Sequence, residues 1–123
     1  MRFFDLWKRP DINRGLEEYD VMPEAVLLDV RTPQEYREGH IPCSRNVPLQ
    51  RIEGVRAVAG HKDIPLFVYC YSGARSSEAA YVLREMGYTC VKNIGGVYGY
   101  EGRLERGCAK GDVLCASPCA AGG

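Results

Sequence analysis

The sequence lacks any apolar run of the ~20 residues that a membrane-spanning helix needs. At the amino terminus, Asp5 and Lys8 interrupt a group of aromatic residues, so this segment does not have the pattern of a signal peptide. We therefore expect a cytoplasmic protein. In that compartment the 6 cysteines would be mostly reduced, and their even number is no argument for a set of disulfides.

The sequence also lacks an excess of charge of either sign. Its 16 Lys and Arg residues balance 16 Asp and Glu residues. Proteins that bind nucleic acid or other polyanions generally carry a basic surface. We therefore expect neither a nucleic-acid partner nor association with a membrane.

Short apolar runs alternate with helical patterns along the 123 residues, a length that suits one compact domain. We expect strands near residues 25–30, 45–47, 66–69 and 89–94, and helices near residues 12–19, 33–38, 49–59 and 79–86. This alternation predicts an α/β domain with a mostly parallel sheet and helices on both faces. The domain should span residues 1–106. Residues 107–123, rich in Cys, Gly and Ala, should form a flexible tail.

Local signals mark several element boundaries. Thr32 and Glu35 have the spacing of a capping box, and Gly39 can end the short helix that they begin. Gly95 and Gly96 are expected to break the last strand, before a final short helix that holds Tyr98 and Tyr100. Capping and ion pairing account for Asp29, Arg31 and Glu35, and His40 is interpreted as a turn residue.

The segment from Cys70 to Ser76 carries the chemistry. Cys70 ends the strand predicted at residues 66–69, and ligand sites of open α/β sheets lie at the carboxyl ends of strands. A loop of small residues before a helix can direct successive N–H groups at one centre, and Arg75 can add a cation. These groups should lower the pKa of Cys70 and make its thiolate a nucleophile. The alternative is a buried core cysteine and an ordinary surface arginine.

This setting predicts a two-step sulfur transfer. Cys70 attacks the outer sulfur of a donor such as thiosulfate, sulfite leaves, and a second thiophile removes the sulfur held on Cys70. The donor would bind to the rest of the loop, Tyr71, Ser72, Gly73, Ala74, Arg75 and Ser76. No cofactor or metal is expected, because the spacing of Cys108, Cys115 and Cys119 does not suit a zinc site.

Five sequence segments together resemble the rhodanese homology domain. They are Leu28–Tyr36, Gly39–Pro42, Asn46–Leu49, the Cys70 loop and Gly95–Gly96, within a similarity that covers about residues 11–105. The resemblance implies a rhodanese-like three-layer fold with a five-stranded parallel sheet. It also implies a single-domain sulfurtransferase in which Cys70 carries a persulfide and the loop amides through Arg75 bind the donor.

The resemblance also bears on the substrate. Cys70 and Arg75 are separated by four residues, as in rhodaneses, whereas the related phosphatases and arsenate reductases have five; those activities are the lesser alternative. Tyr71 occupies a position where many thiosulfate-using members have a basic residue. This difference favours a persulfide or polysulfide donor, or a protein partner. The acceptor would be a thiol, cyanide or a protein.

Two other functions stay open at this point. One is a non-catalytic rhodanese-like interaction module, against which the intact Cys70 and Arg75 argue. The other is a thiol redox protein that uses Cys43 or the tail cysteines. In that hypothesis Cys43 would resolve an oxidised Cys70 by forming a transient disulfide with it.

Overall fold

The computed structural model describes residues 10–107 of the chain. Its helices and strands are, in chain order, α2 (Ile12–Asp20), β1 (Val26–Asp29), α3 (Pro33–Glu38), β2 (Arg45–Asn46), η1 (Leu49–Gly54), α4 (Val55–Val58), β3 (Leu66–Cys70), α5 (Ala74–Glu85), β4 (Val91–Gly96) and η2 (Val97–Gly99). No helix in this part of the chain is long and apolar enough to cross a membrane. The predicted tail, apart from Gly107, lies outside the described residues.

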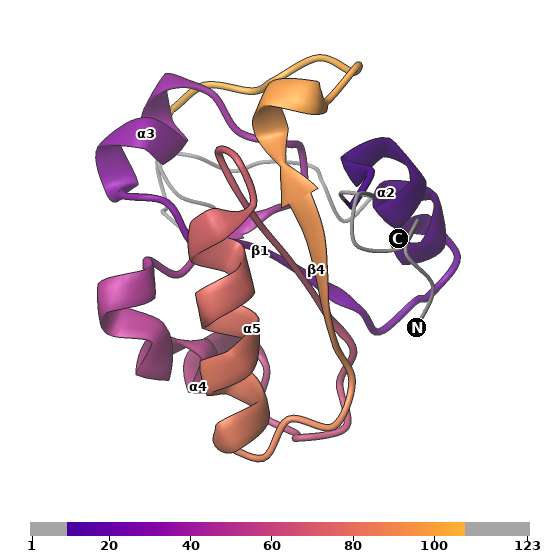
Figure 1. The fold of residues 1–123 in the computed structure, drawn as a ribbon, viewed down its shortest axis with the longest axis vertical. Coiled ribbons are helices and arrows are strands. Elements are labelled where there is room, and N and C mark those ends of the chain that lie inside the picture. The colour runs from indigo at the N-terminus through magenta and orange to yellow at the C-terminus, as the bar shows by residue number, and fades with distance from the viewer. Residues whose placement is uncertain (1–9, 108–123) are drawn as a thin grey trace, which may run out of the picture.

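The strands form one parallel sheet in the order β2-β1-β3-β4. Figure 1 shows α2 on one side of this sheet and α4 and α5 on the other. The predicted α/β class, the parallel sheet and the helices on both faces are therefore confirmed. Because all strands run the same way, their carboxyl ends meet at one edge of the sheet.

The predicted number of strands is wrong. The sheet has 4 strands within the described residues, where the family resemblance implied five. After β4 the chain turns through η2 and leaves the sheet, and Glu105 makes only an isolated antiparallel bridge to His40. The segment that follows β4 therefore ties down the turn after α3 and adds no strand to the sheet.

The apolar core lies in two clusters, one on each face of the sheet. Alternate residues of the strands supply them: Leu28 and Val68 belong to the cluster under α5, whereas Leu27 and Phe67 belong to the cluster under α2. Strand β3 is buried at every position, as expected of the central strand. Cys70 ends β3 within the cluster on the α5 side.

Two predicted elements have different boundaries. The helix expected near residues 49–59 is divided into η1 and α4, and η1 is itself kinked at Arg51, whose backbone angles of −128° and 41° are not helical. The last strand continues through Gly95 and Gly96, which were expected to break it. Its pairing with β3 is shifted by one residue after Asn93, and Gly95, with φ of 108°, lies at this irregularity. Glycine allows the positive φ without the strain that a side chain would add.

Helix α2 lies very close to β4, and Gly15 makes this approach possible. A Cβ built on Gly15 would lie 2.4 Å from Cγ2 of Ile94, whose side chain is buried and branched at Cβ. Glycine weakens a helix, but the absence of a side chain here lets α2 cover the sheet. Packing therefore overrides helix propensity at this position.

We predict that Gly15→Ala destabilises the protein by about 1–2 kcal/mol. Overpacking a core costs about 1–3 kcal/mol, and the better helix propensity of alanine returns at most about 1 kcal/mol. Urea unfolding measures the difference. The control is Gly60→Ala, an exposed position where a Cβ would have no neighbour within 4 Å. A Gly15→Ala protein as stable as the control would contradict the close approach.

Candidate active site

Cys70 lies where the central strand ends and the long helix α5 begins. It is the last residue of β3, and α5 starts four residues later at Ala74. Gly73 precedes the helix in a left-handed conformation with φ of 103°, which turns the chain sharply from strand to helix. The strand-loop-helix arrangement that the sequence predicts around Cys70 is therefore present.

The sulfur of Cys70 accepts hydrogen bonds from its own loop. The amide nitrogen of Gly73 lies 3.0 Å from Sγ, and the hydroxyl oxygen of Ser76 lies 3.5 Å from it. Burial raises the pKa of Cys70, but the hydrogen bonds from the Ser76 hydroxyl and from the amides of Ser76, Gly73 and Ser72 together outweigh it, so the pKa is lowered. These dipoles favour the thiolate, the form that acts as a nucleophile.

Asn93 of β4 holds the loop in place, and sequence reasoning missed it. Its Oδ1 accepts a hydrogen bond from the Gly95 amide at 3.0 Å. It also lies 2.7 Å from the Ser76 hydroxyl oxygen and shares the one hydroxyl proton with the more distant Sγ of Cys70. Its Nδ2 donates to the carbonyl oxygen of Gly73 at 3.3 Å. Asn93 therefore orients the Ser76 hydroxyl and the Gly73 peptide, both of which contact the sulfur. The sequence did offer one signal for this role, namely a polar asparagine within the strand predicted at residues 89–94.

Gly96 lets the loop pack against the end of β4. A Cβ at this position would lie 2.2 Å from the carbonyl oxygen of Tyr71 and 2.6 Å from Cα of Ser72. Both are backbone atoms that cannot move without displacing the loop. The glycine pair was expected only to end a strand, whereas Gly96 leaves the space that the loop occupies.

Arg75 is paired with Glu35, a contact that sequence reasoning did not anticipate. Its guanidinium donates to both carboxylate oxygens of Glu35, at 2.8 Å and 3.1 Å. The hydrogen bond from Arg75 is the largest cause that lowers the pKa of Glu35, to about 2 from 4.5. A lowered acid pKa means that the pair is intact above about pH 4.5 and is lost as the pH falls through about 2. The charge of Arg75 is therefore balanced at neutral pH.

Glu35 has a second role that the sequence did predict. It completes the capping box of α3 with Thr32, since the side chain of each residue accepts a hydrogen bond from the backbone N–H of the other. The short helix α3 thus presents Glu35 to the loop after β3. One side chain connects the start of α3 with the first turn of α5.

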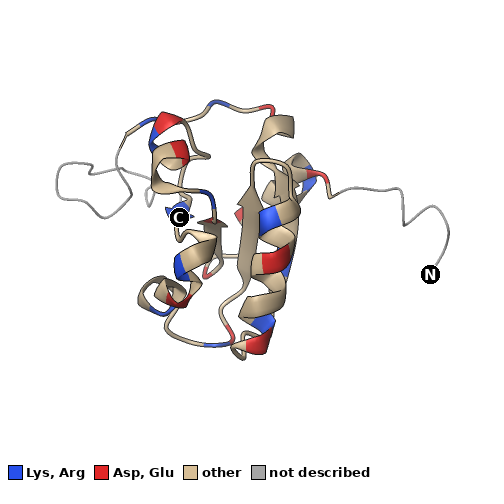
Figure 2. Ribbon diagram, turned by 60° about the vertical axis from the view of Figure 1, so that its left-hand side comes forward, with Lys and Arg blue, Asp and Glu red and all other residues tan. Residues whose placement is uncertain are grey.

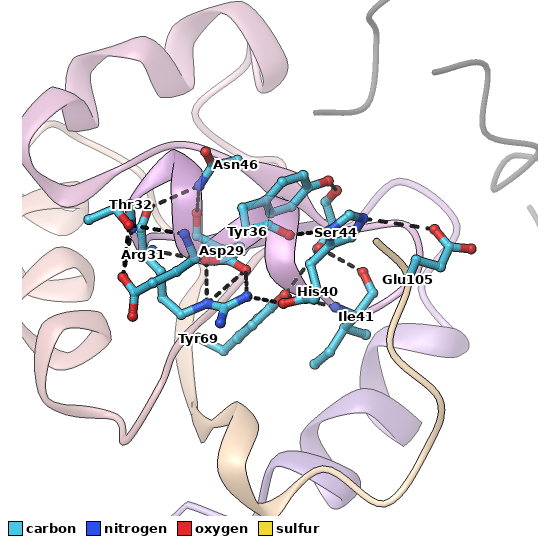
Figure 3. A network of polar contacts seen from close by, with 12 residues as sticks. Asp29, Arg31, Thr32, Tyr36, His40, Ile41, Ser44, Asn46, Tyr69 and Glu105 are labelled. Atoms are coloured by element: carbon cyan, nitrogen blue, oxygen red, sulfur yellow. Dashed lines mark hydrogen bonds and ion pairs between the residues drawn. The ribbon is translucent and has the colours of Figure 1, made fainter. Parts of the chain in front are cut away.

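A buried polar network supports this edge of the sheet (Figure 3). The Arg31 guanidinium donates to both oxygens of Asp29 and, at 2.6 Å, to the carbonyl oxygen of Gly39. Asn46 donates to the carbonyl oxygens of Asp29 and Arg31. These contacts join the end of β1 to the end of α3. They agree with the structural roles expected for Asp29 and Arg31.

His40 lies in the turn after α3, where it contacts Tyr36 and Glu105. Its ring stacks on Tyr36 with centroids 3.7 Å apart, and Nδ1 lies 2.7 Å from the carbonyl oxygen of Tyr36. Nε2 lies 3.9 Å from a carboxylate oxygen of Glu105. Figure 3 shows His40 between Tyr36 and Glu105. This position matches the interpretation of His40 as a turn residue.

Two hollows of about 520 Å³ each flank the loop. One is lined by Ser72, Gly73 and Ala74 together with residues of β4, and the other by Tyr71 together with residues of α3. Tyr98 borders both. The rings of Tyr71 and Tyr98 are 54% and 59% exposed, and their centroids are 5.9 Å apart. Tyr71 and Tyr98 thus form an aromatic rim beside the loop that carries Cys70.

The structure does not bring Cys43 and Cys70 together. Cys43 is disulfide-bonded, whereas Cys70 is a free thiol. Cys43 borders a hollow with Leu16 and Tyr19, on the α2 side of the sheet, while Cys70 belongs to the cluster on the α5 side. The transient Cys43–Cys70 disulfide of the redox hypothesis is absent here, and Cys43 is not the reduced thiol that the sequence led us to expect. Cys108, Cys115 and Cys119 lie outside the described residues.

Comparison with known proteins places this site in a family. The model of the rhodanese-like domain matches residues 11–102. The thiosulfate sulfurtransferase PspE of Escherichia coli (strain K12) is 38% identical over 71 residues, which are 57% of this chain and 68% of PspE. The tRNA uridine(34) hydroxylase of Enterobacter sp. (strain 638) is 29% identical over 102 residues, covering 78% of this chain but only 28% of that protein.

A solved structure described as a rhodanese with anions from E. coli superimposes with a TM-score of 0.64 and 33% identity, and the match covers 68% of this chain and 99% of that one. The chain therefore belongs to the rhodanese-like domain family. Its relatives include proteins named sulfurtransferases, so the family resemblance seen in the sequence is confirmed.

We predict that Ser76→Ala raises the pKa of Cys70 by about half a unit. The change removes one hydrogen bond to the sulfur, and such a bond contributes about 0.5–1.5 kcal/mol. The pH dependence of alkylation by iodoacetamide measures the shift, read on the tryptic peptide of residues 63–75, in which Cys70 is the sole cysteine. Ser77→Ala, at the exposed neighbouring serine, is the control and should leave the midpoint unchanged.

Proposed function

We propose that this protein is a sulfurtransferase that carries a sulfane sulfur as a persulfide on Cys70. The main support is the hydrogen-bonded sulfur of Cys70 at the carboxyl end of the central strand. A thiolate there is stabilised by amide and hydroxyl dipoles and needs no separate base. The same donors can hold the outer sulfur of a persulfide, because it is also anionic.

The transfer takes two displacements. In the first, the Cys70 thiolate attacks the outer sulfur of thiosulfate or a persulfide; the new bond to Sγ forms, the S–S bond of the donor breaks, and sulfite or a thiolate leaves with the electron pair. In the second, an acceptor thiolate or cyanide attacks the outer sulfur, and Cys70 leaves as a thiolate. Sulfur changes carrier, and no external oxidant or reductant is consumed.

Relatives with a different name do not favour a different function for this chain. The tRNA hydroxylase shares only 28% of its length with the match, so most of that protein has no counterpart here. A free, stabilised Cys70 thiol argues against a non-catalytic interaction module. The disulfide at Cys43 keeps a redox protein as the second candidate function, although Cys70 takes no part in that disulfide. A cytoplasmic location stays a prediction from the sequence.

We predict that incubation with glutathione persulfide or thiosulfate adds one sulfur atom to Cys70, detected by mass spectrometry of the intact protein and of the peptide 63–75. Cys70→Ala should gain no sulfur in that peptide. Cys90→Ala, which removes an exposed free thiol at the other end of β4, should behave like the parent protein. An unchanged Cys70 would support an interaction module, and a disulfide at Cys70 would support redox chemistry; either result would contradict sulfur transfer.

We predict that Glu35→Gln lowers the KM for thiosulfate by about threefold. The substitution releases the Arg75 guanidinium to face an anionic donor, and the gain corresponds to a partly exposed ion pair. Glutamine keeps the capping box of α3, so the fold should persist. Steady-state kinetics test this, with Glu85→Gln on the far end of α5 as control. A raised KM would instead show that Glu35 holds Arg75 in its donor-binding position.

A further inference from the structure

We propose that the hollow beside Tyr71 binds the organic part of the sulfur substrate and selects thiols and persulfides that carry a positive charge. The inference rests on the proposed sulfur transfer, and it names the substrate class of that site. It is based on the net negative charge of the side chains that line the hollow and on the exposed tyrosines at its rim.

The charged groups that line this hollow, among the described residues, are Arg31, Glu35 and Glu38. The Arg31 guanidinium is bound to buried Asp29, and the Glu35 carboxylate is bound to Arg75. Each of these pairs is neutral as a whole. Glu38 is exposed. Among the described residues, its carboxylate accepts a hydrogen bond from the uncharged side chain of Gln34 and forms no ion pair. The hollow therefore keeps one negative charge.

Among the described residues, the hollow on the other side of the loop has no unpaired cation either. Asp11 is the one charged residue among its described lining residues, and its carboxylate caps α2 by accepting from Asn13. Figure 2 shows acidic and basic positions interspersed along the helices. A dianion such as thiosulfate would thus meet the loop dipoles but no unpaired cation in either hollow.

The rim of the hollow supplies apolar and aromatic surface. Tyr71, Tyr98 and Leu104 line it, and all three side chains are exposed. The backbone amide of Tyr98 donates to the carbonyl oxygen of Tyr71 at 3.2 Å, which fixes the two tyrosines relative to each other. Aromatic faces attract ammonium and guanidinium groups, and a nearby carboxylate strengthens that attraction. Tyr71, Tyr98 and Glu38 together thus suit an alkyl chain that ends in a cation.

The same group would be bound in both half-reactions. A donor persulfide gives its outer sulfur to the Cys70 thiolate and leaves as a thiolate, and an acceptor thiolate takes the sulfur by the reverse of this exchange. In each case the S–S bond of one partner breaks as that of the other forms. The organic part of donor and acceptor passes through one position, so one charge preference governs both.

Methanethiosulfonates test the preference without sulfur transfer. They join a thiolate in a mixed disulfide and release methanesulfinate, so aminoethyl, hydroxyethyl and sulfonatoethyl reagents differ only in the charge of the transferred group. Rates at Cys70, read on the peptide 63–75 and divided by the rates with free mercaptoethanol, should favour the cationic over the anionic reagent by about fivefold at low salt. Equal normalised rates would overturn the inference.

Variants locate the charge that is responsible. Glu38→Gln should reduce the cationic preference to about twofold, whereas Glu85→Gln, an equally exposed acid on the far end of α5, should leave it unchanged. A preference insensitive to Glu38→Gln would overturn the assignment of the hollow. If Cys70 reacts with none of the reagents, the proposed function is contradicted as well. If Cys70 accepts sulfur but shows no charge preference, only this inference is contradicted.

A final measurement distinguishes the two sources of such a thiol. Protein loaded with sulfur on Cys70 is mixed with cysteamine or with a short peptide in which lysine precedes cysteine, each matched with its carboxylate counterpart. Loss of the added sulfur is followed by mass spectrometry. Preference for cysteamine alone indicates a small aminothiol, and preference for the lysine peptide indicates a protein acceptor. Absence of preference in both pairs would overturn the proposal.

Discussion

The site depends on one constraint: a sulfur that must carry negative charge lies at the end of a completely buried strand. Cys70 is only 1% exposed, and burial alone would keep it a neutral thiol. Hydrogen-bond donors within the next six residues offset the effect of burial on the Cys70 thiolate. Gly73 provides the turn, Gly96 provides the space, and Asn93 holds the peptide and hydroxyl groups in orientation. Removing any of these features disturbs the balance between desolvation and hydrogen bonding.

The two arginines at this edge of the sheet, Arg31 and Arg75, have structural roles. Arg31 is used to bind Asp29 and the end of α3, and Arg75 is used to bind Glu35. Both arginines thus join the short helix α3 to the sheet and to α5, while their charges are balanced. The hydrogen bonds that lower the pKa of Cys70 come from the Ser76 hydroxyl and from backbone amides, which are fixed dipoles and need no rearrangement in the proposed sulfur transfer. The hollow that remains outside is acidic and aromatic.

Local signals made much of this predictable. The Thr32–Glu35 capping box, the apolar run of β3 and the Cys70 loop each depend on neighbours in sequence, and the structure contains all three. Contacts between distant segments were not predictable in the same way. The Glu35–Arg75 pair spans 40 residues, and the contact of Asn93 with Ser76 spans 17. The interruption at Arg51 and the missing fifth strand likewise follow from tertiary packing, which no local pattern encodes.

A cradle of dipoles also suits the kinetics of sulfur exchange better than a strong cation would. In the proposed sulfur transfer, Cys70 attacks as a thiolate in one step and leaves as a thiolate in the next. Lowering the thiol pKa increases the thiolate fraction and helps the leaving step, but it also weakens the attacking nucleophile. In this site several hydrogen bonds outweigh burial and lower the pKa of Cys70, while Arg75 is bound to Glu35. This balance between burial and hydrogen bonding suits Cys70 both as the attacking group and as the leaving group of the proposed transfer.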